Sequence, residues 1–130
     1  MVFRDAATSG MPDVARLLLE RGLVTDVNAT LDWLRRTALH LAATWGHVDV
    51  VEVLLAHRDV DVNVRALDAG KTPLHIAAQN GHVDVVRALL AHRGVNVNAW
   101  SVGKVTPLCL ANVYKRIDVA KCLLEHGAEG

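Results

Sequence analysis

The seven histidines and two cysteines are the side chains of this sequence that could do the most chemistry. Imidazoles and thiolates are the common ligands of zinc, and a cysteine beside a base is a nucleophile. Cys109 and Cys122, however, lack the CxxC spacing of zinc and redox sites, and two cysteines are too few for a disulfide framework. Such sparse cysteine favours a reducing compartment, and we expect a cytoplasmic protein.

The histidines recur along the chain at a fixed spacing, which argues against a metal site. Six of them form three pairs 35 residues apart: His40 with His75, His47 with His82, and His57 with His92. The seventh, His126, occupies the position of His57 and His92 in a later segment. A repeated structural unit explains every one of them. We therefore predict structural histidines, no metal and no cofactor.

Catalytic motifs are also missing from the sequence. Cys109 falls at the place of His40 and His75 in the repeated unit, and Cys122 falls where the other copies have packing residues. No base or oxyanion motif accompanies either thiol, and neither GxxxxGK nor GxGxxG occurs. We predict that the protein is not an enzyme.

Composition and charge narrow the class of partner. Fourteen Lys and Arg balance fourteen Asp and Glu, so no net field attracts a nucleic acid or an anionic membrane. No run approaches 18 apolar residues, and the N-terminus does not resemble a signal peptide. With 52% hydrophobic residues, 130 residues suffice for one domain that folds alone.

Laid on itself, the chain shows four copies of one unit. Residues 37–58 and 72–93 are identical at sixteen of twenty-two positions, at an offset of 35 residues. Weaker copies span residues 106–127 and 1–22. We thus predict a single domain over 1–130, with the four copies joined by connectors at 23–36, 59–71 and 94–105.

Each copy has the pattern of a short helix pair. A threonine suited to cap a helix opens the last three copies, and proline follows it at the first helical position in two of them: Thr37, Thr72 and Thr106, then Pro73 and Pro107. Gly46 and Gly81 are placed to end the first helix in a left-handed conformation. An acid then opens the second helix, where it favours the helix dipole: Asp13, Asp49, Asp84 and Asp118.

Apolar residues at helical spacing predict the core of the second helices, with Leu54 and Leu89 at its centre. The connectors carry DVN at 26–28 and 61–63 and NVN at 96–98. Asx side chains close turns by bonding nearby backbone, so these segments are predicted to be turns or hairpins.

The segment TPLHIAAQNGHVDVVRALLAHRGVNVNA resembles the ankyrin repeat at nearly every signature position, and TALHLAATWGHVDVVEVLLAHRDVDVN matches almost as well. This resemblance implies a mainly α solenoid of stacked antiparallel helix pairs with hairpin or loop fingers. It also implies that the TPLH and GH histidines tie adjacent loops together by hydrogen bonds. The chain departs from the family in its longer fingers, and polar residues such as Asp5, Glu20 and Glu125 suggest terminal caps.

Residues that differ between copies of a common framework indicate the binding surface, which the resemblance places on the concave face and the fingers. The predicted protein-binding residues are Trp33, Leu34, Arg36, Thr44, Trp45, Leu67, Lys71, Gln79, Asn80, Trp100, Val113 and Tyr114. Aromatic anchors dominate the energy of many interfaces. An alternative is that Trp45 folds over a neighbouring helix or finger, or that Trp33 and Trp100 pack against the next finger.

These residues predict a monomeric module that binds another protein, with neither nucleic acid nor membrane as partner. One alternative is an inhibitor that blocks an enzyme surface. Another is a structural fragment of a longer ankyrin array that self-associates weakly through exposed tryptophans.

Overall fold

The computed structural model describes residues 2–129 and shows eight α-helices within them. They are α1 (Val2–Ser9), α2 (Pro12–Glu20), α3 (Ala38–Trp45), α4 (Val48–Leu55), α5 (Pro73–Asn80), α6 (Val83–Leu90), α7 (Pro107–Val113) and α8 (Ile117–Glu125). In this part of the chain, no helix combines the length and apolar character needed to cross a membrane.

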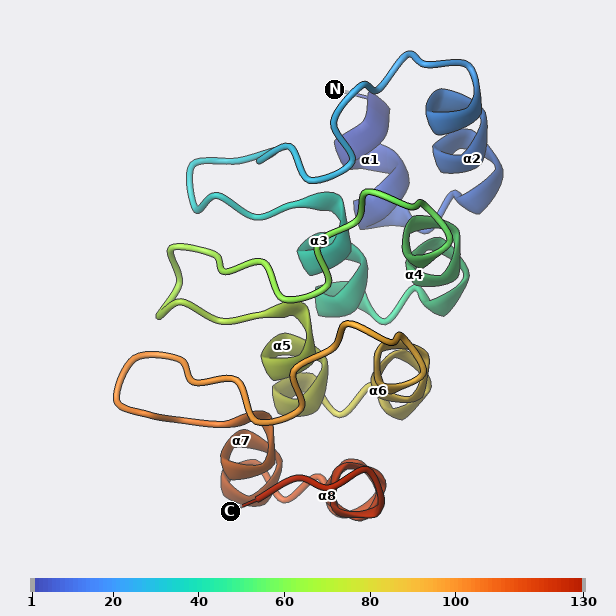
Figure 1. Ribbon diagram of the computed structural model, residues 1–130. Coiled ribbons are helices and arrows are strands. Elements are labelled where there is room, and N and C mark those ends of the chain that lie inside the picture. The colour runs from blue at the N-terminus through green and yellow to red at the C-terminus, as the bar shows by residue number, and fades with distance from the viewer. Residues whose placement is uncertain (1, 130) are drawn as a thin grey trace.

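The helices form two parallel columns, as Figure 1 shows. The first helices α1, α3, α5 and α7 each contact the next in one column, and the second helices α2, α4, α6 and α8 do the same in the other. Three long connectors project from the first-helix column, away from the second helices. We call them finger 1 (23–36), finger 2 (59–71) and finger 3 (94–105). This arrangement confirms the predicted solenoid of helix pairs.

Local capping starts and ends the first helices as predicted. The hydroxyls of Thr37 and Thr72 each accept a hydrogen bond from the backbone N–H three residues on, at 3.4 Å, and Thr106 does so at 3.2 Å. Gly46 and Gly81 close α3 and α5 at φ values of 74° and 75°, a left-handed conformation that costs glycine little. A short helix pair therefore forms with a tight turn between its members.

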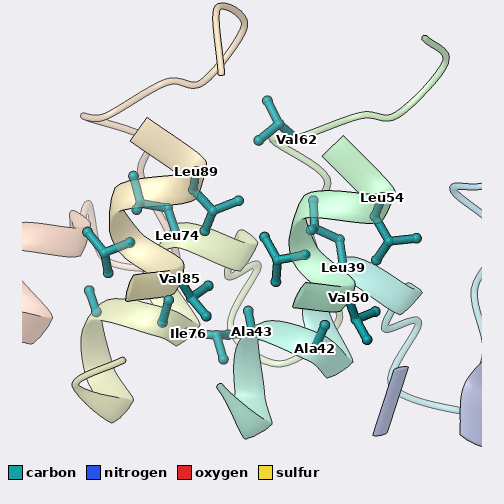
Figure 2. Close-up of a cluster of buried hydrophobic side chains, with 14 of the residues drawn as sticks. Leu39, Ala42, Ala43, Val50, Leu54, Val62, Leu74, Ile76, Val85 and Leu89 are labelled. Carbon is teal, nitrogen blue, oxygen red and sulfur yellow. The ribbon is translucent and has the colours of Figure 1, made fainter. Parts of the chain in front are cut away.

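The core lies between the two columns (Figure 2). Leu54 and Leu89 are 0% exposed, and the small residues Ala42 and Ala77 let the helices approach closely. Because the same positions recur in every copy, the buried side chains form one continuous cluster along the stack. Each repeat is thus completed by its neighbours.

The glycine–histidine turn between the helices carries a contact to the preceding repeat. Nε2 of His47 donates to the Thr8 carbonyl and Nε2 of His82 to the Thr44 carbonyl, both at 3.0 Å. In the last copy, Arg116 donates from Nε to the Gln79 carbonyl at 3.0 Å, so it takes the place of the histidine. Sequence analysis did not identify this contact of Arg116.

The connectors contain the predicted Asx turns, in which Asn28, Asn63 and Asn98 donate their backbone N–H to the Asx side chain two residues earlier. Of the predicted alternatives, turns and loops predominate: within residues 2–129 only one isolated bridge, between Ser101 and Val105, has strand geometry. In fingers 1 and 2 the reversal is closed by one backbone hydrogen bond, from Leu31 N to Arg36 O and from Ala66 N to Lys71 O.

The last residue of each Asx turn also links successive connectors. Asn63 donates from Nδ2 to the Gly94 carbonyl at 2.7 Å and accepts from the Asn96 backbone N–H at 2.8 Å. Asn28 and Asn98 repeat this pair of bonds one repeat earlier and one repeat later. Asn28, Asn63 and Asn98 therefore link each connector to the next and hold successive repeats in register.

We expect Asn63→Ala to lower the free energy of unfolding by about 1 to 3 kcal/mol, since two hydrogen bonds of about 0.5 to 1.5 kcal/mol each are lost. Urea unfolding followed by circular dichroism would measure it. Asn80→Ala, which removes a single bond to the Thr44 carbonyl at 3.2 Å, is a matched control with a smaller expected loss. Equal losses in both variants would contradict a special role for the asparagine ladder.

Candidate functional site

Three fingers form a continuous edge beside the first helices. Each finger is closed at its base by a backbone hydrogen bond: Leu31 N to Arg36 O at 2.8 Å, Ala66 N to Lys71 O at 3.0 Å, and Ser101 N to Val105 O at 2.8 Å. Backbone bonds of 2.8 Å also join the fingers, from Leu67 N to Leu34 O and from Val102 N to Ala69 O. The edge is thus organised before any partner arrives.

Asp32 organises finger 1, a role that sequence analysis missed. Its carboxylate accepts from the backbone N–H groups of Leu34 and Arg36, both at 3.0 Å, and from Nε of Arg36 at 2.7 Å. Burial alone would raise the pKa of this carboxyl, but the hydrogen bonds from Arg36 and Leu34 and the charge of Arg36 hold the pKa below its usual value. The sequence signal that could have indicated this role of Asp32 is an Asp placed four residues before an Arg in a predicted turn.

The polar residues of the predicted site are partly committed to contacts within the chain. Arg36 is paired with Asp32, and its side chain is 30% exposed. Nζ of Lys71 donates to Oε1 of Gln79 at 2.8 Å, which joins the base of finger 2 to the last turn of α5. The hydroxyl of Thr44 bonds the His40 carbonyl at 2.8 Å. These contacts restrain the side chains of Arg36, Lys71, Gln79 and Thr44 within the predicted site.

The large apolar residues of the predicted site are exposed, apart from half-buried Leu34. Trp33 is 84% exposed, so neighbouring fingers of this chain do not cover it. Trp45 is 58% exposed at the end of α3. The others are Leu67, Trp100, Val113 and Tyr114. Apolar residues exposed singly are ordinary on a protein surface, so these exposures describe the predicted residues without assigning them a role.

Trp100 of finger 3 contacts two cationic side chains. Nζ of Lys104 lies 5.3 Å from the centre of the Trp100 ring, and Arg65 of finger 2 hydrogen-bonds the Trp100 carbonyl. Trp100 is still 54% exposed. A cation–π contact thus lies on the Trp100 ring, and about half of the residue stays exposed.

Trp33, Leu34 and Trp45 belong to two different elements. Trp33 and Leu34 lie in finger 1, before α3, whereas Trp45 is the last residue of α3. At 1.5 Å per residue an eight-residue helix is about 12 Å long. Val113 and Tyr114 lie farther along the stack, at the end of α7. The candidate site is an extended surface with several anchors.

The histidines that first suggested chemistry serve the framework. Nε2 of His40 donates to the Lys71 carbonyl at 3.0 Å, and Nε2 of His75 donates to the Val105 carbonyl at 2.8 Å. Both contacts confirm the linking role implied by the resemblance. Among the residues that the structure describes, no group of three or more His, Cys, Asp or Glu side chains is placed to hold a metal ion.

Cys109 replaces this histidine in the last copy, where its Sγ lies 3.2 Å from the Thr106 hydroxyl. Hydrogen bonds from the side chain and backbone of Thr106 lower the pKa of the Cys109 thiol, and they outweigh its burial. Cys109 is half-buried, and its backbone N–H donates to the Thr106 hydroxyl that caps α7. Its contacts are therefore those of a capping residue.

Sequence analysis did not predict the groove between the second helices on the opposite side of the molecule. It has a volume of about 660 Å³ between α2 and α4. It is lined by Pro12, Arg16, Leu19 and Glu20 of α2 and by Asp49, Glu52, Val53, Ala56 and the adjoining His57 of the α4 segment. No sequence pattern marks such a groove, because it arises only when two helices pack side by side.

Comparison with known proteins now decides the family. A family model described as "Ankyrin repeats (many copies)" matches residues 3–55 and 39–90. The chain belongs to the ankyrin-repeat family. Ankyrin repeats are protein-interaction modules and are typically non-catalytic, and the two columns of helices with projecting fingers have the form of an ankyrin-repeat solenoid.

Two curated relatives are the GA-binding protein subunit beta-1 of Bos taurus and that of Homo sapiens. Each is 43% identical to this ankyrin-repeat chain over 51 residues, which is 39% of the chain and 12% of the relative. The chain therefore spans only a small part of the length of these relatives, and the similarity extends to repeats rather than to whole proteins.

Proposed function

We propose that this ankyrin-repeat protein binds a partner protein through the surface made by fingers 1 to 3 and the ends of α3, α5 and α7. The observation that carries the proposal is the exposure of Trp33 and Trp45, at 84% and 58%, on a framework held by finger-to-finger and finger-to-helix hydrogen bonds. Buried aromatic anchors supply much of the energy of protein interfaces, and a preorganised surface loses little entropy on binding.

The polar residues Lys71, Gln79 and Asn80 would form the rim around these anchors, as polar side chains do at most interfaces. Lys71 and Gln79 bond each other, and Asn80 bonds the Thr44 carbonyl, so their positions are already set in the free protein. Leu34, Arg36, Thr44, Leu67, Trp100, Val113 and Tyr114 complete the proposed surface. We further propose a single domain of four repeats in a cytoplasmic, reducing setting, which suits two free cysteines.

Affinity capture from a source lysate tests the proposal, with Trp33→Ala/Trp45→Ala as the variant. If these residues are anchors, truncation should weaken binding by about 2 kcal/mol or more, which is about 30-fold. A partner captured by the unaltered chain and lost with the variant is expected. Leu17→Ala/Leu23→Ala, which removes two exposed leucines from the first helix pair and the loop after it, is the matched control.

Equal capture by the unaltered chain and the tryptophan variant would contradict the proposed surface. Circular dichroism should show the same helicity in all three proteins, because each altered residue is exposed. An activity assay on a captured enzyme would separate an adaptor from an inhibitor, since only an inhibitor lowers the partner's activity.

A further inference from the structure

Two grooves lie between neighbouring second helices, in the column of helices that stands away from the fingers (Figure 1). We call the groove between α2 and α4 groove 1. The groove between α4 and α6, which has a volume of about 680 Å³, is groove 2. Each lies between two helices that contact each other in the stack, so both grooves are formed by the packing of consecutive repeats.

The lining of each groove includes apolar side chains that remain partly open to solvent. Leu19 and Val53 are half-buried in groove 1, and Ala56 lines both grooves. Ala88 and Ala91 line groove 2. Alanine is too short to fill the space above two helices whose axes lie about 8 to 10 Å apart. Both grooves can therefore take aliphatic side chains from outside, which gain free energy by leaving water.

Acidic side chains predominate in groove 1. Three carboxylates line it: Glu20, Asp49 and Glu52. Within residues 2–129, none of the three forms an ion pair. The guanidinium of Arg16, which also lines the groove, pairs instead with Asp13 at 3.0 Å. The imidazole of His57 accepts a hydrogen bond at Nδ1 from the Asp59 backbone N–H at 3.1 Å. Groove 1 thus carries negative charge that no lining residue neutralises by direct contact.

Groove 2 is closer to neutral. Nη1 of Arg87 lies 4.0 Å from Oδ1 of Asp84, and both residues line this groove. Glu52, which lines both grooves, is the remaining acid of groove 2. Selection by charge should therefore be stronger in groove 1.

Helix capping accounts for Asp49 but not for the two glutamates of groove 1. Asp49 lies in the first turn of α4, where the helix dipole favours an acid. Glu20 is the last residue of α2, where the dipole disfavours one. Glu52 stands at the place of Arg16 and Arg87 in the flanking copies. Such a reversal of charge on a repeated framework is the kind of difference that indicates a binding surface.

We propose that groove 1 is a second protein-interaction surface, separate from the fingers, and that it binds a basic amphipathic helix of a partner protein. A helix presents side chains three and four residues apart on one side, so a row of aliphatic residues can reach Leu19 and Val53. Lysine or arginine beside that row then meets Glu20 on α2 and Asp49 or Glu52 on α4. Charge complementarity selects a basic helix over an acidic one.

Selection from a peptide-display library tests the proposal. Its members share aliphatic residues at helical spacing and carry Lys, Glu or Ser at random beside them. We expect the unaltered chain to enrich lysine-flanked peptides, whose binding weakens as salt is added. In Glu20→Lys/Glu52→Arg their affinity should fall about tenfold or more, because attraction becomes repulsion. Helicity should be retained, since both residues are exposed and arginine already occupies the place of Glu52 in two other copies.

Glu125→Lys/Glu129→Lys is the matched control, because it changes the net charge equally at two exposed acids that line neither groove. This control should enrich the same peptides as the unaltered chain. Trp33→Ala/Trp45→Ala should also enrich them, because the fingers do not form groove 1. The absence of a preference for lysine would overturn the proposal, as would equal losses in the groove variant and the control. Loss in the tryptophan variant would place the peptides on the finger surface and would overturn it too.

Discussion

Truncation of Leu54 or Leu89 to alanine should lower the free energy of unfolding by about 2 to 5 kcal/mol, the range for deletion of a fully buried leucine. Both side chains are 0% exposed and belong to inner repeats, so each cavity opens where two neighbouring repeats meet. Domains are stable by only about 5 to 15 kcal/mol in total, so the loss is a large share of the whole.

Urea unfolding monitored by circular dichroism measures this effect. Leu124→Ala is the matched control, since it removes the same atoms from a helix position that is 56% exposed. Exposed substitutions usually change stability by no more than about 0.5 kcal/mol. If Leu124→Ala destabilised the protein as much as Leu54→Ala, the location of the core between the helix columns would be wrong.

Acidification should destabilise the protein through His40 and His75. Burial lowers the pKa of both imidazoles from 6.5, and the hydrogen bonds that they donate to the Lys71 and Val105 carbonyls only partly oppose this. The unfolded chain then binds more protons than the folded chain below about pH 6.5. Stability is therefore full above that pH and falls as the pH drops from there through the lowered folded pKa values.

Urea midpoints measured from pH 8 to pH 5 would follow this loss. His75→Gln is the informative variant: it should be less stable at every pH, because a buried capping and linking group is changed, but its stability should fall less on acidification. His57→Asn/His92→Asn changes two half-buried imidazoles in loops and serves as the control. An unchanged pH dependence in His75→Gln would show that other groups cause the acid effect.

Sequence predicted the helices and their caps well because these features depend on near neighbours. Thr72, Pro73 and Gly81 act within a single helix, and the repeated spacing of His40 and His75 indicated one role for both. The resemblance to ankyrin repeats supplied the nature of that role. The core followed from helical periodicity, since Leu54 and Leu89 recur at equivalent positions.

The predicted surface shows where such reasoning stops. Arg36 was predicted to be a protein-binding residue, and the structure shows that its guanidinium pairs with Asp32. Arg116, which the sequence did not single out, donates to the Gln79 carbonyl. Trp33 and Trp45 were both predicted to bind a partner, and they belong to different elements, finger 1 and the end of α3. For each of these residues, the sequence provided no information about which residues it contacts or lies near in space.

The sequence by itself determined that this protein is a stack of four similar helix pairs, because period, caps and apolar spacing record local interactions. Only the tertiary structure decided which side chains remain available to a partner. The exposure of Trp33 and the asparagine ladder through Asn63 depend on segments about 30 residues or one whole repeat away. Contacts at that range arise from packing, and no local pattern encodes them.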